Sequence, residues 1–108
     1  MNDRLTGLLG MARRAGRLIA GYDAVAASVK AGKAKLVLLA ADLSAKTEKE
    51  LRFAAGDAVP LLSSALTKEE IGHTAGFNKP VGVIATEDSG FAAALVKAAN
   101  CRNEEDAV

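Results

Sequence analysis

Apolar residues recur with the helical spacing of three to four in five stretches of the chain. In the first stretch, Leu5, Leu9 and Ala12 fall on one face, and Asn2 is placed to cap the helix. Ser44 caps the third stretch in the same way, and Thr67 with Glu70 matches a capping box before the fourth. The pattern predicts helices over residues 2–15, 22–31, 45–55, 68–75 and 90–99, the last capped by residues 87–89.

Short apolar runs lie between these helices and predict strands over residues 17–20, 36–41, 59–62 and 81–85. The run from Leu36 to Ala41 contains no polar residue, which predicts a strand buried on both faces by helices above and below it. Pro60 favours an edge or strand-start position for its own run. The alternation of helices and strands predicts an α/β fold with a small central sheet.

The length of 108 residues supports one domain, which we place at residues 1–100, followed by an acidic tail at 101–108 that we expect to be frayed. The single cysteine, Cys101, excludes an internal disulfide and a cysteine-rich zinc site. Neither a signal peptide nor an apolar run of membrane-spanning length is present. These features predict a cytoplasmic protein that does not contact membranes.

Basic residues are concentrated at the start of the chain, although the net charge of the whole is only +1. Residues 1–35 carry seven basic and two acidic side chains, whereas residues 36–108 carry seven basic and eleven acidic ones. Arg13, Arg14 and Arg17 fall on the flank of the first helix that points away from its apolar face. This distribution indicates a side that faces a polyanion. The alternative is that the basic side chains only solvate helix surfaces.

Gly21 stands where the first strand meets the second helix. A glycine there lets a ligand backbone approach closely, and the first turn of the helix offers unpaired amides to a phosphate. Lys33 and Lys35 flank the far end of the same helix, so two phosphate-attracting points bracket it. The alternative reading is that Gly21 and Gly32 only bound the helix and that Asp23 caps it.

The chain offers little that predicts catalysis. His73 is the only histidine and has no nucleophile or metal ligand at usable spacing, and Cys101 has no electropositive setting in the sequence. No phosphate-binding loop, paired carboxylates or metal-ligand cluster emerges. We therefore expect a protein without catalytic residues, cofactor or metal.

Residues 21–42 and 66–85 carry a resemblance to a known family. After Gly21 and a short helix, the run GKAKLVLLAAD at 32–42 is followed at the right separation by LTKEEIGHTAG at 66–76 and by the apolar run at 81–85. This order resembles the ribosomal protein L7Ae/L30e superfamily and its bacterial YlxQ-like branch, over residues 5 to about 98. The resemblance implies a three-layer α-β-α sandwich with a small central mixed sheet. It also implies binding to structured RNA, typically the kink-turn, an asymmetric internal loop with tandem sheared G·A pairs.

The resemblance implies RNA-binding positions that this chain retains only in part. The family's asparagine, glutamate and lysine, which read the sheared guanines, are replaced by Asp23, Ala24 and Ala27. Asp23 can accept hydrogen bonds from a guanine but cannot donate to its O6 or N7. The implied set is Gly21, Tyr22, Asp23, Ala24, Ala27, Lys33, Lys35, Asp42, Phe77, Asn78, Lys79 and Val81, with Arg13, Arg14 and Arg17 as an auxiliary basic patch.

The loop at residues 77–81 stands where the family packs apolar atoms against an extruded base. Phe77 either stacks there or belongs to the core, and the sequence leaves both open. We expect non-enzymatic binding of structured RNA, either a kink-turn or ribosomal RNA, with the ribosome as a candidate partner, and no binding to DNA. The alternative is a protein-interaction module on the same fold that no longer reads RNA.

Overall fold

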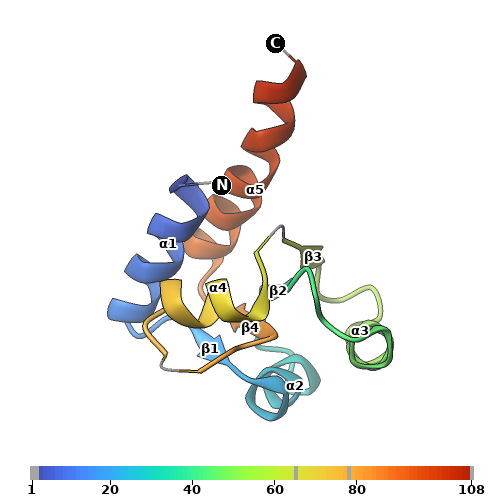
Figure 1. The fold of residues 1–108 in the computed structure, drawn as a ribbon. Coiled ribbons are helices and arrows are strands. Elements are labelled where there is room, and N and C mark those ends of the chain that lie inside the picture. Colours follow the sequence, from blue (N-terminus) through green and yellow to red (C-terminus); the bar gives the residue numbers. More distant parts are fainter. Residues whose placement is uncertain (1–2, 65, 78, 108) are drawn as a thin grey trace.

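The computed structural model describes residues 3–64, 66–77 and 79–107, with side chains over 4–64, 66–77 and 79–99. Five helices and four strands alternate along this part of the chain (Figure 1). Their bounds are α1 Asp3–Arg14, β1 Ile19–Ala20, α2 Tyr22–Lys30, β2 Leu36–Leu39, α3 Ala45–Ala55, β3 Leu61–Ser63, α4 Lys68–Thr74, β4 Val83–Thr86 and α5 Ser89–Ala107. The predicted order of elements is confirmed. The Asn2 cap lies outside the described residues.

The four strands form one mixed sheet in the order β1-β4-β2-β3. Strand β4 runs antiparallel to both of its neighbours, with Ile84 opposite Ala20 on one side and Leu38 on the other. Strand β3 lies parallel to β2 at the edge of the sheet. Pro60 immediately precedes this edge strand, as the sequence predicted.

Helices cover both faces of the sheet. Leu36 and Leu38 of β2 belong to a core shared with α1, α4 and α5, whereas Val37 and Leu39 belong to a second core shared with α2 and α3. All four β2 residues are buried, which confirms the prediction from their unbroken apolarity. Figure 1 shows α2 and α3 together on one side of the sheet and the other helices on the opposite side.

Several element bounds differ from the sequence prediction: β1, β2 and β3 cover residues 19–20, 36–39 and 61–63 instead of 17–20, 36–41 and 59–62, and β4 and α5 differ as well. The last strand begins at Val83 rather than at Val81, because the Val81 amide donates to the Lys68 carbonyl of α4 at 2.9 Å instead of to a neighbouring strand. The last helix continues to Ala107 rather than ending near residue 99. No glycine or proline follows Gly90 to interrupt it.

The helix caps agree with the sequence prediction. The Ser44 hydroxyl accepts from the Thr47 amide, and Thr67 and Glu70 form the predicted capping box. Asp88 caps α5 by accepting from the Phe91 amide at 3.0 Å. No helix in the described part of the chain is long and apolar enough to cross a membrane.

Candidate nucleic-acid interface

The junction between β1 and α2 is fixed by Gly21. Its amide donates to the Val83 carbonyl at 3.0 Å, and its backbone has φ 96° and ψ 149°, a conformation that side-chain-bearing residues rarely adopt. No side chain caps α2, so the amides of its first turn are available to an anion. Gly21 rather than Asp23 is the N-cap residue, and the phosphate-binding role of this helix start stays a prediction.

The loop at residues 79–82 lies beside this junction. Its end is held by the Gly82 carbonyl, which accepts from the Ala40 amide at 2.9 Å, and by the bond from Val81 to Lys68. The backbone of Lys79 packs directly on Gly72 of α4, where a Cβ atom would overlap its carbonyl oxygen. We call residues 21–24, 41–42 and 79–82, which meet at this end of the sheet, the junction surface.

Asp42 has a structural role within the junction surface. Its carboxylate Oδ1 accepts from the Lys68 amide at 2.8 Å, at the start of α4. Lys68 in turn accepts from Val81, so Asp42 ties the end of β2 to the loop through α4. Sequence reasoning missed Lys68, although its place directly after the Thr67 cap marked it as part of a helix start.

The α2 residues that the sequence predicted to face the RNA bases point away from the core. Tyr22, Asp23, Ala24 and Ala27 are exposed, while Val25 and others on the opposite face are buried in the core shared with α3. The side chains at positions 23, 24 and 27 therefore do not contribute to the core. This helix face therefore presents Tyr22, one carboxylate and two methyl groups beside the junction.

Lys33 and Lys35 lie at the other end of α2. The Lys35 amide donates to the Thr86 carbonyl at 2.8 Å, at the opposite end of β4 from Val83. A nine-residue helix is about 13 Å long, so these lysines do not join the junction surface but stand roughly that distance from it. Both are exposed and free to contact phosphates.

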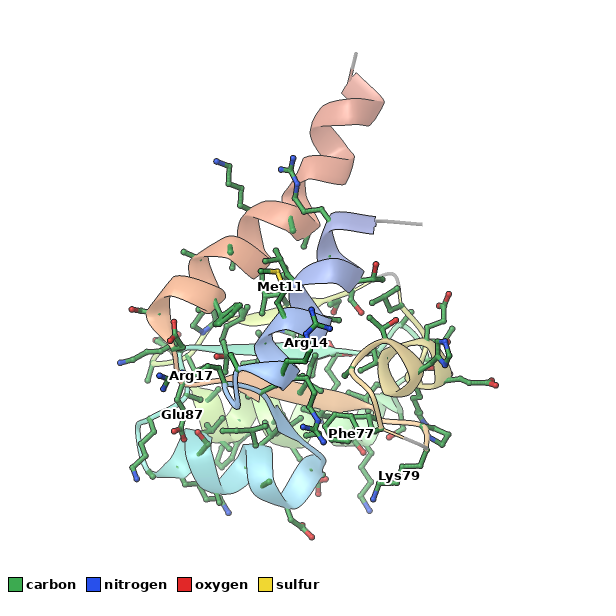
Figure 2. The ribbon with its side chains drawn as sticks, turned by 90° about the vertical axis from the view of Figure 1, so that its left-hand side faces the viewer. Met11, Arg14, Arg17, Phe77, Lys79 and Glu87 are labelled. Carbon is green, nitrogen blue, oxygen red and sulfur yellow. The ribbon has the colours of Figure 1, made fainter. Side chains whose placement is uncertain are left out.

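The structure also separates the three arginines. Arg17 lies 3.7 Å from Asp88, whereas the Arg13 guanidinium carbon lies 4.8 Å from the centroid of the Phe77 ring. Figure 2 shows Phe77 and Lys79 on one side of the molecule and Arg17 with Glu87 on the other, with Arg14 between them. Only Arg13 and the exposed Arg14 are therefore candidates to extend the junction surface.

The loop residues have different exposures. Phe77 is half-buried and packs against the core shared by α1, α4 and α5, while Arg13 covers its ring. Val81 is buried, so it offers backbone rather than side chain to a ligand. Lys79 is exposed, and Asn78 lies outside the described residues. An open groove of about 590 Å³ runs beside α4 and is lined in part by Phe77, Lys79 and Pro80.

Comparison with known proteins identifies the family of this chain. The model of the ribosomal protein L7Ae/L30e/S12e/Gadd45 family matches residues 3–96. The chain belongs to this family. It is also 33% identical over 89 residues to a Bacillus subtilis protein named RNA-binding protein YlxQ, covering 82% of this chain and 88% of that protein. A protein of the same name from Enterococcus faecium is 34% identical over 79% of this chain and 81% of its own length.

Solved structures share the L7Ae family fold of this chain. A Bacillus halodurans protein of unknown function superposes with a TM-score of 0.82 at 30% identity, covering 93% of this chain and 99% of that one. The Giardia lamblia 15.5kD RNA binding protein superposes with a TM-score of 0.69 at 21% identity, covering 91% and 83%. At that identity the second likeness concerns the fold alone.

The L7Ae-type site contains no arrangement for metal chemistry in its described residues. No group of three histidine, cysteine, aspartate or glutamate side chains comes together among the residues with described side chains. His73 is exposed on α4 and lines the groove with Glu69 and Thr74. The side chain of Cys101 lies outside the described residues. What the site offers is backbone amides, lysines and a ring covered by an arginine.

Proposed function

We propose that this chain binds structured RNA without catalysing a reaction, and that the junction surface is its main contact. The observation that carries the proposal is the bond from the Gly21 amide to the Val83 carbonyl, which holds the uncapped start of α2 against the 79–82 loop. A phosphate bound by the first-turn amides would then lie close to Lys79. The names of the two YlxQ relatives and membership of the L7Ae family support RNA as the polyanion.

The proposed contact has two electrostatic centres. The amides at the start of α2 and Lys79 form one, and Lys33 with Lys35 forms the other at the far end of the helix. An RNA strand that follows the exposed face of α2 would meet both, because about 13 Å corresponds to two or three phosphates. Binding of this kind weakens steeply with salt and positions the protein without reading sequence.

Base reading is the weak part of the proposed interaction. A good bidentate base contact contributes about 1–3 kcal/mol of discrimination. With Asp23, Ala24 and Ala27 at the three reading positions, those contacts are missing, and the Asp23 carboxylate opposes a phosphate at the start of the helix. We infer that the chain binds a kink-turn or a ribosomal RNA mainly through charge and shape, with little preference for the sheared G·A pairs.

Fluorescence anisotropy with a synthetic kink-turn RNA and a plain duplex of equal length tests this proposal. The Lys33→Ala/Lys35→Ala variant should lose affinity for both RNAs and should show a shallower salt dependence. Lys46→Ala/Lys49→Ala, which removes two exposed lysines from α3, is the matched control and should bind like the wild type. The absence of wild-type binding to either RNA at low salt would refute the proposal. If the wild type binds, cosedimentation with ribosomal subunits would separate ribosomal RNA from other targets.

One observation favours a second function, that of a protein-interaction module. Phe53 on α3 is 91% exposed, the largest exposed fraction of any bulky apolar side chain in the described residues. Aromatic side chains are enriched among the residues that contribute most to protein–protein binding. Protein partners that survive nuclease treatment and are lost in Phe53→Ser would support this function, whereas loss of all partners on nuclease treatment would contradict it.

A further inference from the structure

Arg13 and Phe77 form a contact that joins the last turn of α1 to the loop after α4. The guanidinium carbon lies 4.8 Å from the ring centroid, within the range of a cation–π interaction. The loop side is held in place, because the Phe77 amide donates to the Gly72 carbonyl at 2.8 Å and Gly76 turns the chain with φ 82°. A fixed ring therefore supports one face of the Arg13 side chain.

Arg13 differs from the other arginines that have a described partner. Arg17 lies 3.7 Å from Asp88, and Arg52 lies 2.8 Å from Glu48 on its own helix. No carboxylate is paired with Arg13 in the described part of the chain, and its side chain is exposed. Its charge is thus not neutralised, and the face of the guanidinium that does not cover Phe77 is open to a ligand.

We propose that the open face of the Arg13 guanidinium stacks against an unpaired nucleobase of the bound RNA. This inference rests on the proposed RNA-binding function and adds a contact from α1 to it. Proteins that read unpaired RNA bases stack them on aromatic rings and on arginine planes. Phe77 holds the guanidinium in position before binding, which lowers the entropy that the long side chain loses when the base arrives.

The surroundings favour RNA over an acidic protein surface as the occupant. Phe77 lies in the same short loop as the exposed Lys79, which belongs to the junction surface, and Arg14 is exposed next to Arg13. RNA supplies both a flat base for the guanidinium and phosphates for the neighbouring cations. A carboxylate-bearing protein would satisfy the cations but would leave the stacking plane without a partner.

Anisotropy titrations with abasic RNAs test the stacking contact. The probe is a synthetic kink-turn RNA in which each unpaired nucleotide is replaced in turn by an abasic residue. For the wild type, we expect one abasic RNA to bind roughly tenfold more weakly than the intact RNA. Arg13→Ala should bind the intact RNA more weakly and should show no further loss on that abasic RNA. Arg13→Lys should keep the wild-type salt dependence but should also lack the abasic effect.

Two variants serve as controls. Arg14→Ala removes one charge from the same turn of α1 without touching the ring, so it should retain the full abasic effect. Phe77→Leu keeps an apolar side chain at the core contact but removes the ring, and it should reduce the abasic effect while thermal unfolding shows that the domain is folded.

The outcomes that overturn the proposal are distinct from failure of RNA binding itself. If Arg13→Ala retains the abasic effect of the wild type, no base stacks on Arg13. If Arg13→Ala and Arg14→Ala weaken all RNAs equally, Arg13 contacts only phosphates. If the wild type binds none of the RNAs at low salt, the proposed function is wrong, and the stacking contact is refuted with it.

Discussion

Replacing Gly72 by alanine should raise the free energy of unfolding if helix propensity dominates and lower it if tertiary packing dominates. Gly72 lies inside α4, where replacing glycine by alanine ordinarily stabilises a helix by about 0.8–1 kcal/mol. In this structure the added Cβ would overlap the carbonyl oxygen of Lys79 and would lie 2.9 Å from its carbonyl carbon and 3.3 Å from the Cα of Pro80. These are backbone atoms, so the loop has to move as a whole.

Forced overpacking of this kind typically costs about 1–3 kcal/mol. Because the added Cβ overlaps backbone atoms rather than a movable side chain, we expect a cost of about 2–3 kcal/mol. After the gain in helix propensity is subtracted, Gly72→Ala should lower the free energy of unfolding by about 1–2 kcal/mol. For a domain of this size each kcal/mol lost corresponds to a decrease in melting temperature of roughly 4–8 °C. RNA binding should weaken as well, because Lys79 moves with the loop.

Urea unfolding followed by circular dichroism measures this effect. Gly7→Ala is the matched control, since Gly7 lies in α1, is exposed, and has no atom within 4 Å of an added Cβ. That variant should gain about 0.5–1 kcal/mol. If Gly72→Ala is as stable as the wild type, or gains stability as Gly7→Ala does, the packing of the loop on α4 is wrong.

Two further predictions concern the supports of the junction surface. Gly21→Ala should lose about 1–3 kcal/mol of stability in the same urea assay although no atom lies within 4 Å of its added Cβ, because the residue has φ 96°. A loss below about 0.5 kcal/mol would show that this conformation is not required. Asp42→Ala should speed hydrogen exchange of the Lys68 amide relative to the wild type. Asp42→Asn keeps an acceptor oxygen, so its Lys68 amide should exchange more slowly than that of Asp42→Ala. Equal exchange in both variants would exclude the proposed role of Asp42.

Features that depend on neighbours in the sequence were predicted well. Ser44 and Thr67 were identified as caps because their partners lie three residues away, within the same turn. The run from Leu36 to Leu39 identified the central strand because burial on two faces removes every polar residue from it. The α/β sandwich follows from these local patterns.

Features that depend on distant pairings could not be predicted from the pattern. Arg13 and Phe77 are 64 residues apart, and nothing in either segment indicates that the guanidinium covers the ring. The antiparallel pairing of β4 with β1 and β2 decides which loops meet at each end of the sheet. That pairing places Lys35 at the opposite end from Gly21, whereas the sequence treated both as parts of one surface.

We propose that this L7Ae-family chain keeps an RNA-binding junction but lacks the family's base-reading side chains. The variant Asp23→Asn/Ala24→Glu/Ala27→Lys tests it most directly. All three positions are exposed on α2, so the changes should leave the fold intact.

Affinity would be measured for a kink-turn RNA and for the same RNA with its G·A pairs replaced by Watson–Crick pairs. We predict that the wild type binds the two RNAs within about threefold of each other. The variant should favour the kink-turn by at least about tenfold. Strong discrimination by the wild type, or none by the variant, would contradict the account.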